Sequence, residues 1–249
     1  MVCYRMKQID INSDVGEGVG NETELMPLIS SCNIACGGHA GDEVTMAETI
    51  RLAIKYHVKI GAHPSYPDKP NFGRKMMDIP ASDLIFSLKK QLTNFLHVLR
   101  KEGGELHHIK PHGALYNAIA KDEGLADTFL DAIEDLKSIP IYLPHLSKIH
   151  RAAIKRGFRF YLEAFADRNY YANLMLVSRV DENALIKEPK MVLEHVLNMA
   201  KRKQVKTIDG EFIEIMAHTF CVHGDTSSAL EILTYLHQEL PNNNIQIKR

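Results

Sequence analysis

The segment Lys7-Gln-Ile-Asp-Ile-Asn-Ser-Asp-Val-Gly-Glu-Gly18 alternates apolar and polar residues and then reaches two glycines, a pattern typical of a β-strand that ends in a loop. In such a strand the isoleucines face one side, so Asp10, Asn12 and Asp14 face the other. Acidic groups in a protein interior are costly unless they are paired, hydrogen-bonded or bound to a metal. The acids therefore indicate a functional site, although Asp10 alone also fits a loop cap or a pair with a buried lysine.

Strand-like and helix-like segments alternate along the rest of the chain. Short apolar runs stop at Gly or Pro, and longer segments repeat apolar residues at helical spacing, most clearly in 82–100. The further expected strands are 31–36, 58–62, 106–110, 140–143, 158–166 and 217–222, with a hairpin of 205–208 and 211–215 around Asp209-Gly210. The expected helices are 43–57, 82–100, 126–137, 189–202, one that Ser147 caps and Gly157 ends, and a last one that Asp225 caps and that reaches Leu240.

Strand followed by helix, repeated about seven times, predicts parallel strands with crossover helices. A closed α/β barrel of about seven strands suits a chain of 249 residues. An open, doubly wound sheet is the rival architecture, because periodicity alone does not separate the two. The chain shows no linker, low-complexity stretch or internal repeat, so the sequence predicts one domain over residues 1–249.

Composition excludes several classes of function. The chain has 30 Lys+Arg and 31 Asp+Glu, a net charge of −1, so no basic field attracts nucleic acid. No apolar run approaches the ~18 residues that cross a bilayer, and the N-terminus has no apolar signal region, so we expect no membrane partner and a cytoplasmic location. No Gly is followed by Lys, which excludes a P-loop for nucleotide phosphates.

Polar residues gather after the expected strands, beside Gly, Ala and Pro. The carboxyl ends of parallel strands share one face of a β/α fold, so side chains far apart in sequence converge there. The candidates are Asp14 and Glu17 after the first strand, Asn33 and His39 after the second, His63 after the third with Arg74 in the loop beyond it, Lys110, His112 and Asn117 after the fourth, Glu163, Asp167 and Arg168 after the sixth, and His223 and Asp225 after the last.

Seven motifs in this order resemble the LamB/YcsF family, which comprises A subunits of bacterial 5-oxoprolinase. The motifs are Asp10-Ile-Asn-Ser-Asp-Val-Gly-Glu17, Asn33-Ile-Ala-Cys-Gly-Gly-His-Ala-Gly-Asp42, Gly61-Ala-His-Pro64, Phe72-Gly-Arg74, Lys110-Pro-His-Gly-Ala-Leu-Tyr-Asn117, Glu163-Ala-Phe-Ala-Asp-Arg168 and Cys221-Val-His-Gly-Asp225. The resemblance extends from about Asp10 to Leu240. Gly38 and Ser13 stand where the family usually has Phe and Ala, and 170–176 lacks a common Gly; these departures affect pocket shape more than chemistry.

The resemblance implies a barrel of the glycoside hydrolase/deacetylase type. It also implies ATP-dependent opening of 5-oxo-L-proline to L-glutamate together with partner subunits B and C. The ring nitrogen of a lactam is a poor leaving group, and phosphorylation of the amide oxygen would activate the carbon for attack by water. This chain has no P-loop, and the resemblance implies that the partner subunits bind ATP at least in part. This subunit would then supply a base, an acid and cations.

Roles can be assigned on that basis. We expect Asp14 or His39 to be the base that activates water and His112 to be the acid that protonates the ring nitrogen. Lys110, Arg168 and Arg74 are expected to hold anionic groups, with Asp167 orienting Arg168. Glu17 is a further catalytic or orienting candidate, and the remaining substrate-binding or orienting candidates are Asn12, Asn33, His63, Asn117, Glu163, Asp167, His223 and Asp225.

Two alternatives from other classes remain open at this point. The first is a metal-dependent carbohydrate deacetylase, since related barrels bind a divalent metal through one Asp and two His; Asp14, His39 and His63, or His112, would make such a set. The second is a non-catalytic subunit that binds the substrate and delivers it to B and C.

Overall fold

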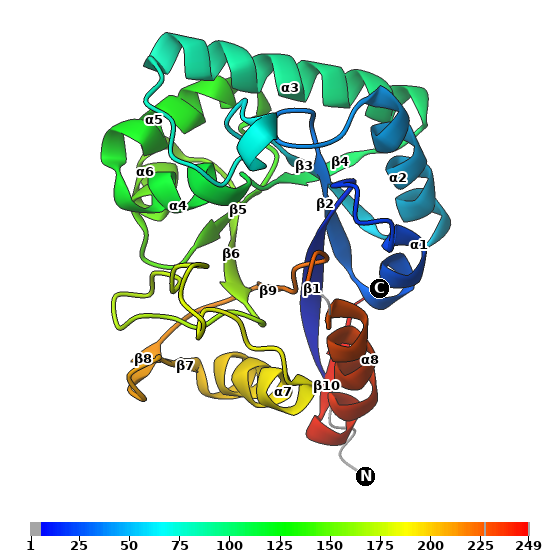
Figure 1. The fold of residues 1–249 in the computed structure, drawn as a ribbon, viewed down its shortest axis with the longest axis vertical. Helices are drawn as coiled ribbons and strands as arrows, with labels where there is room; N and C mark the ends of the chain where they lie inside the picture. The colour runs from blue at the N-terminus through cyan, green and yellow to red at the C-terminus, as the bar shows by residue number, and fades with distance from the viewer. Residues whose placement is uncertain (1–5, 227, 249) are drawn as a thin grey trace.

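The structure, a computed structural model, describes residues 6–226 and 228–248. Seven parallel strands form a barrel in the order β1-β2-β3-β4-β5-β6-β9, and β9 pairs with β1 to close it (Figure 1). The strands are β1 (Lys7–Val15), β2 (Ser31–Ala35), β3 (Lys59–His63), β4 (Leu106–Ile109), β5 (Ile141–Pro144), β6 (Phe160–Phe165) and β9 (Thr219–Cys221). The barrel prediction is therefore confirmed, and the open sheet is wrong. A further strand, β10 (Ile245–Ile247), extends the outer edge of β1.

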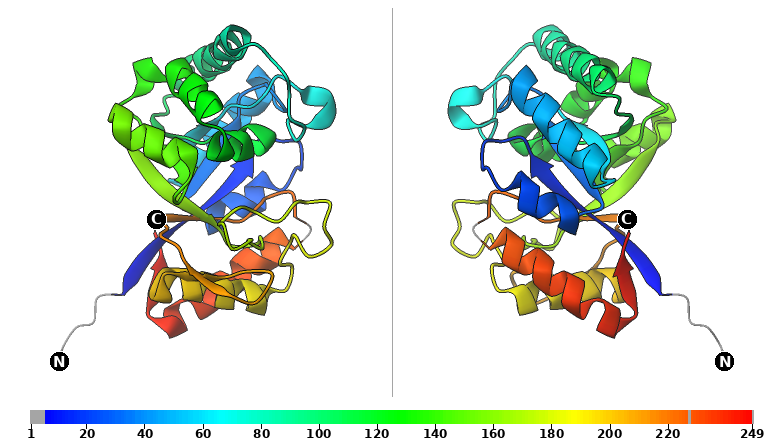
Figure 2. Two further views of the ribbon diagram at one scale, coloured as in Figure 1. Left: turned by 90° about the vertical axis from the view of Figure 1, so that its left-hand side faces the viewer. Right: turned by 90° about the vertical axis from the view of Figure 1, so that its right-hand side faces the viewer.

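Helices surround the strands on the outside of the barrel (Figures 1 and 2). They are α1 (Glu22–Leu25), α2 (Glu43–Lys55), α3 (Ala81–Lys101), α4 (Gly113–Lys121), α5 (Glu123–Ala132), α6 (Lys148–Arg156), α7 (Pro189–Leu197) and α8 (Ala229–Glu239). The apolar stripe of α3, from Leu84 to Leu99, is buried, as its spacing predicts. Within residues 6–226 and 228–248, no helix is both long and apolar enough to cross a membrane.

Local capping explains where several elements begin and end. The Ser147 side chain accepts a hydrogen bond from the His150 amide at the start of α6, and Gly157 ends that helix in the left-handed conformation, as expected. The predicted hairpin is also present: β7 (Gln204–Lys206) and β8 (Phe212–Glu214) pair antiparallel.

Some predicted helix boundaries are wrong. The expected helix 126–137 begins earlier, because Asp122 caps α5 through the Leu125 amide, and it breaks after Ala132 into a short 3-10 turn. The segment 113–121 forms α4, which the periodicity did not separate from the preceding strand end. Asp225 does not cap the last helix; α8 follows Ser228, and the Asp225 carboxylate instead pairs with two arginines.

Asp10 lies in the barrel interior, and both oxygens of its carboxylate have polar partners. Its Oδ1 accepts hydrogen bonds from Ser31 (2.8 Å) and Thr219 (2.7 Å), and its Oδ2 lies 3.3 Å from Nζ of Lys59. Asp10 thus pairs with a lysine, as one of the two structural explanations had it, but Lys59 is partly exposed (34%) rather than buried. This pair borders a cavity of about 290 Å³ at the amino ends of the strands, away from the site described next.

Candidate active site

A cavity of about 520 Å³ opens at the carboxyl ends of the barrel strands. It brings together ten of the residues singled out from the sequence: Asp14, Glu17, His63, Arg74, Lys110, His112, Asn117, Arg168, His223 and Asp225. The other five candidates do not line it: Asn12, Asn33, His39, Glu163 and Asp167. These five are buried next to the cavity and contact residues that line it. They are therefore not placed to touch a substrate in the cavity directly.

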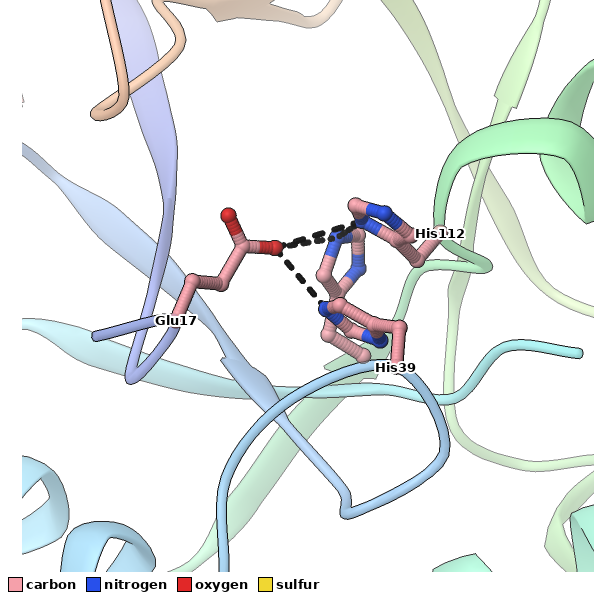
Figure 3. A group of neighbouring side chains, drawn as sticks. Glu17, His39 and His112 are labelled. Atoms are coloured by element: carbon pink, nitrogen blue, oxygen red, sulfur yellow. Dashed lines mark hydrogen bonds and ion pairs between the residues drawn. The ribbon is translucent and has the colours of Figure 1, made fainter. Parts of the chain in front are cut away.

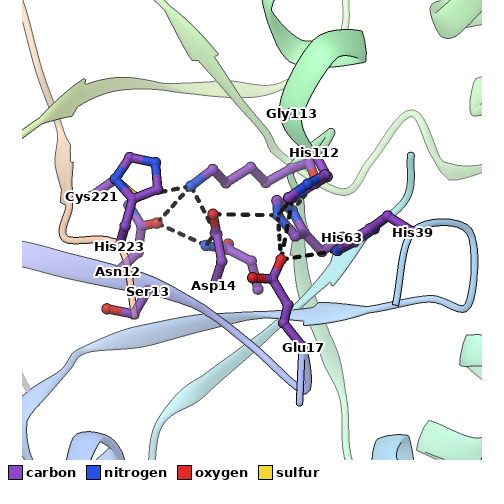
Figure 4. A network of polar contacts seen from close by, with 12 residues as sticks. Asn12, Ser13, Asp14, Glu17, His39, His63, His112, Gly113, Cys221 and His223 are labelled. Atoms are coloured by element: carbon purple, nitrogen blue, oxygen red, sulfur yellow. Dashed lines mark hydrogen bonds and ion pairs between the residues drawn. The ribbon is translucent and has the colours of Figure 1, made fainter. Parts of the chain in front are cut away.

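Lys110 lies at the floor of this cavity, where its side chain is 2% exposed. Its ammonium nitrogen is 2.9 Å from Asp14 Oδ1, 3.0 Å from Glu163 Oε1, 3.2 Å from Asn12 Oδ1 and 3.2 Å from Cys221 Sγ. Figure 4 labels three of these partners, Asn12, Asp14 and Cys221. An ammonium group has three hydrogens to donate, so these four acceptors already saturate it. Lys110 is therefore placed to fix two carboxylates rather than to hold a substrate anion directly.

The charges at the floor stabilise one another. Burial opposes the ionised form of Asp14, but His63 and Lys110 hold the pKa of Asp14 well below its usual value. Burial also opposes the charge on Lys110, yet the Asp14 carboxylate beside it raises the pKa of Lys110 well above the ordinary range. Both groups are thus charged at neutral pH.

Three imidazoles and one carboxylate converge next to Asp14. Oε1 of Glu17 lies 2.9 Å from Nε2 of His39, 3.2 Å from Nδ1 of His112 and 3.8 Å from Nε2 of His63 (Figure 3). The rings of His39 and His112 stack with their centroids 3.6 Å apart. Burial lowers the pKa of His39 to about 4, and burial likewise lowers the pKa of His112, so both rings are neutral near pH 7.

Backbone carbonyls determine the tautomers of two of these rings. Nδ1 of His63 lies 2.7 Å from the carbonyl oxygen of Lys110, and Nε2 of His112 lies 3.0 Å from that of Phe72. A carbonyl oxygen only accepts, so each of these nitrogens carries the ring proton. The opposite nitrogens, Nε2 of His63 and Nδ1 of His112, then face each other at 3.0 Å as two lone pairs. Two lone pairs repel at this distance, so the contact needs either a second proton on one of the rings or a metal ion between or beside the two nitrogens.

A polar layer under the floor holds these groups in position. The Asn33 amide nitrogen donates to Oδ1 of Asp14 and to Oδ1 of Asn12, both at 2.8 Å. The Asn12 amide nitrogen in turn donates to Glu163 at 2.9 Å. His108, which is buried in β4, lies 2.7 Å from the Asn33 carbonyl oxygen and fixes the orientation of that amide. These side chains orient the lining residues from below.

Asp167 orients His223 and not Arg168, contrary to the expectation from their adjacency. Its Oδ1 lies 2.9 Å from Nδ1 of His223, and its Oδ2 accepts the His223 amide proton at 2.9 Å. The Arg168 guanidinium instead donates to the carbonyl oxygens of Val177 (2.5 Å) and Ala184 (3.3 Å).

Arg168 is a buried cation that lines the cavity. It is 5% exposed, and none of the ion pairs within residues 6–226 and 228–248 includes it. Burial, reinforced by the neighbouring charge of Arg179, lowers the pKa of Arg168 to about 10, so the group remains protonated. A buried guanidinium that forms no ion pair attracts an anion from the cavity, although the neighbouring Asp167 carboxylate offsets part of its charge.

Several lining residues were missed in the sequence. They are Tyr116 on α4, Phe165 at the end of β6, and Tyr171 and Arg179 in the segment between β6 and α7. Tyr116 and Phe165 stand within two of the motifs quoted above, but neither was among the candidates. The segment that carries Arg179 has no periodicity, so nothing in its sequence indicated that it folds over the cavity.

Two groups of side chains have donor atoms close enough to hold a metal ion. Glu17, His39, His63 and His112 form one, and Asp14, Cys221 and His223 form the other. The second does not fit a metal, because the Lys110 ammonium already lies against both Asp14 and Cys221. The first fits, because facing imidazole lone pairs and a carboxylate are a donor set for a divalent ion. The group that the structure brings together contains the three histidines of the sequence-based alternatives, with Glu17 in place of Asp14.

The family can now be determined by comparison with known proteins. The model of the LamB/YcsF family matches residues 9–249. The chain belongs to the LamB/YcsF family. A protein of Tolumonas auensis, named as the A subunit of 5-oxoprolinase, is 39% identical over 249 residues, covering 98% of this chain and 99% of that protein. A protein of Bacillus cereus strain Q1 with the same name is also 39% identical, over 97% and 98% of the two chains.

Solved structures agree with the fold. The lactam utilization protein from Thermus thermophilus superposes with a TM-score of 0.89 at 31% identity, over 97% of this chain and 99% of that one. A deacetylase with substrate, T48, gives a TM-score of 0.52 at 12% identity, over 99% and 90% of the two chains, which shows a shared fold only. These similarities favour the lactam function over the carbohydrate deacetylase and over the non-catalytic delivery role.

Proposed function

We propose that this chain is the A subunit of an ATP-dependent 5-oxoprolinase, which opens 5-oxo-L-proline to L-glutamate with partner subunits B and C. The observation that carries the proposal is the cavity with an ionised Asp14 at its floor and, in its wall, a buried Arg168 that forms no ion pair within the described residues. Such a cavity suits a small anionic substrate whose reacting carbon is attacked by water. The full-length relatives that are named as A subunits of 5-oxoprolinase support this substrate.

Asp14 is the better candidate for the base, because it lines the cavity and His39 does not. It would accept a proton as water adds to the lactam carbon. The carbon–nitrogen bond then breaks with its electron pair moving to the ring nitrogen, which needs a proton. His112, the acid expected from the sequence, is neutral and holds its one ring proton against a backbone carbonyl oxygen, so His223 is the better candidate for this acid. Arg168 would hold the carboxylate of 5-oxo-L-proline as a planar, bidentate donor.

ATP belongs to the complex in this proposal. Phosphorylation of the amide oxygen makes the carbon electrophilic and turns a resonance-stabilised amide into a reactive species. Addition of water and cleavage of the carbon–nitrogen bond would then leave an acyl phosphate, which a second water hydrolyses to L-glutamate and inorganic phosphate. The chain has no Gly-Lys loop to cradle nucleotide phosphates, so B and C are proposed to bind ATP and carry out that step. The cytoplasm is the proposed compartment, since the substrate and ATP are found there.

A divalent metal is proposed to bind to Glu17, His39, His63 and His112. Two of the imidazoles already have their outer nitrogens bonded to backbone carbonyls, the arrangement that orients metal-bound histidines. A bound metal would polarise an oxygen and lower the pKa of a coordinated water. With His112 engaged as a ligand, His223, which lines the same cavity and is oriented by Asp167, is the remaining candidate for the acid.

Elemental analysis of protein dialysed against zinc or manganese tests the metal site. His63→Ala is expected to lose bound metal, because it removes one of the two facing imidazole nitrogens. The distant His237→Ala is the control and is expected to keep the metal. Equal metal content in both variants contradicts the assignment.

Reconstitution tests the function. The purified chain is combined with B and C, and glutamate and ADP are measured with 5-oxo-L-proline and ATP. Asp14→Asn is expected to lower glutamate formation by ~10²-fold or more while the complex still assembles. Full turnover by this variant, or deacetylation of a chitooligosaccharide by the chain without ATP, contradicts the proposal.

A further inference from the structure

Two arginines and one aspartate meet at the outer end of the cavity. Arg74 comes from the loop between β3 and α3, Arg179 from the segment between β6 and α7, and Asp225 from the loop between β9 and α8. Oδ2 of Asp225 pairs with Nη2 of Arg74 and lies 3.4 Å from Nη1 of Arg179. The same carboxylate oxygen thus serves two guanidinium groups.

These side chains are far more accessible than the floor. The exposed fractions are 40% for Arg74, 31% for Arg179 and 21% for Asp225, against 2% for Lys110 and 9% for Asp14. Ion pairs at such exposure are weak and exchange readily with other anions. A ligand anion can therefore replace Asp225 without the cost of breaking a buried pair.

The charges at this end do not balance. Two guanidinium groups face one carboxylate, and Arg168 lies close enough to Arg179 for the two cations to interact. The remaining hydrogens of Arg74 and Arg179 form two planar forks, the geometry that matches phosphate oxygens. The ring of Phe72 packs against the Arg74 guanidinium, 4.7 Å from its centroid, and limits the directions in which that fork can point.

We infer that Arg74 and Arg179 form a binding site for a phosphoryl group, and that Asp225 occupies their forks as an internal substitute for that anion. The inference rests on the proposed function, in which a phosphorylated lactam passes through this cavity. Arg168 would take the carboxylate of the substrate, and the outer pair would take the phosphoryl oxygens. Asp225 is then a competitor of the ligand and not a contact for it.

This competition predicts effects of opposite sign. Inorganic phosphate is titrated into the purified full-length chain and followed by calorimetry at low salt. Arg179→Met and Arg74→Met are each expected to weaken phosphate binding by about tenfold, the value of one charge-assisted hydrogen bond. Asp225→Asn is expected to strengthen binding, because the competing charge is removed while the shape is kept.

Matched controls use an exposed ion pair between α2 and the end of α3. Arg51 and Glu102 are joined by two hydrogen bonds, 2.6 and 2.9 Å long, and neither residue lines the cavity. Arg51→Met and Glu102→Gln should leave phosphate binding unchanged. A titration with 5-oxo-L-proline distinguishes the two anion sites. Arg168→Met should weaken the binding of 5-oxo-L-proline, and Arg179→Met should not. A titration with ATP distinguishes the source of the phosphoryl group, because a site for the phosphorylated lactam binds ATP no more tightly than phosphate.

The inference is overturned if Asp225→Asn binds phosphate with unchanged or lower affinity, or if phosphate binding depends on Arg168 alone. Circular dichroism and the unfolding midpoint of each variant show whether it folds. The result is independent of the proposed function, because phosphate binding is measured on the chain alone. Phosphate binding with these signs but no glutamate formation in the presence of B and C would overturn the proposed function and leave the phosphoryl site in place.

Discussion

Replacing Lys110 by Met gives the sharpest test of the floor of the cavity. The substitution keeps much of the side-chain length and removes the ammonium group that now lies within 3.2 Å of four acceptors. Asp14 and Glu163 would remain as buried carboxylates without their cation. Removing one partner from a buried ion pair costs about 3–5 kcal/mol in the free energy of unfolding. For a chain of this size that corresponds to roughly 6–20 °C in the unfolding midpoint.

The pH dependence of this loss has a definite sign. In the native protein, the pKa of Asp14 lies well below its usual value, so Asp14 stabilises the fold above the unfolded pKa of about 3.9 and this contribution is lost as the pH falls. Without Lys110, burial is opposed mainly by His63, so the pKa of Asp14 rises and the carboxyl takes up a proton at a higher pH than in the native protein. The loss in the free energy of unfolding that Lys110→Met causes is therefore largest at neutral pH and becomes smaller toward about pH 4.

Urea unfolding followed by far-ultraviolet circular dichroism measures both effects, since the chain has no tryptophan for fluorescence. The control is Lys89→Met, which removes an exposed pair with Asp135 at 3.6 Å and should change stability by less than about 1 kcal/mol. The double variant Lys110→Met/Glu163→Gln should recover part of the loss, because one unpaired charge is gone. A deficit below about 1 kcal/mol for Lys110→Met, or one independent of pH, would refute the account of Lys110 as the cation that fixes two carboxylates.

Three further predictions concern Arg168, the coupling to ATP and a buried histidine of α7 that does not line the cavity. In complexes with B and C, Arg168→Met should lose turnover, and Arg168→Lys should recover little of it, because an ammonium cannot make the paired contacts of a guanidinium. Equal kcat/KM for the Arg168→Lys variant and the native protein would contradict the bidentate role. The chain alone should not couple ATP hydrolysis to ring opening, so ADP and glutamate appearing together without B and C would contradict it. Burial lowers the pKa of His195 to about 4, so between about pH 6.5 and 4 the unfolded state binds a proton that the native state does not. The free energy of unfolding therefore decreases as the pH is lowered through this range, and His195→Gln should weaken that dependence in urea unfolding.

The fold was accessible from the sequence because its signals are local. Several strands stop at Gly or Pro, as β1, β3 and β5 do, and the long helix α3 carries an apolar stripe from Leu84 to Leu99. The boundaries that failed depend on side-chain caps, such as Asp122 at α5, or on contacts made across the molecule, such as the arginines that hold Asp225. A capping residue and an ion-pairing residue look the same in a sequence.

The residues of the site were predicted better than their arrangement. Alternation along β1 placed Asp14 on the inner face, and strand ends placed the histidines beside it. Sequence could not show that Lys110 is saturated by four acceptors, because these come from three other strands and depend on the closure of the barrel. Nor could it show that Asp167 turns toward His223, because adjacency in the chain says little about where two side chains point.

The state of Asp14 also explains why a lactamase built on this cavity would need ATP. A general base works best when its pKa lies near the working pH, and the pKa of Asp14 is held well below even that of an ordinary carboxyl. Asp14 is therefore a weak base that is permanently ionised and rigidly oriented by Lys110 and Asn33. A weak base is adequate only for a carbon that is already strongly electrophilic, and an unmodified lactam is not. The fixed charges that make the floor so well ordered thus require activation of the substrate, which phosphorylation by the partner subunits would supply.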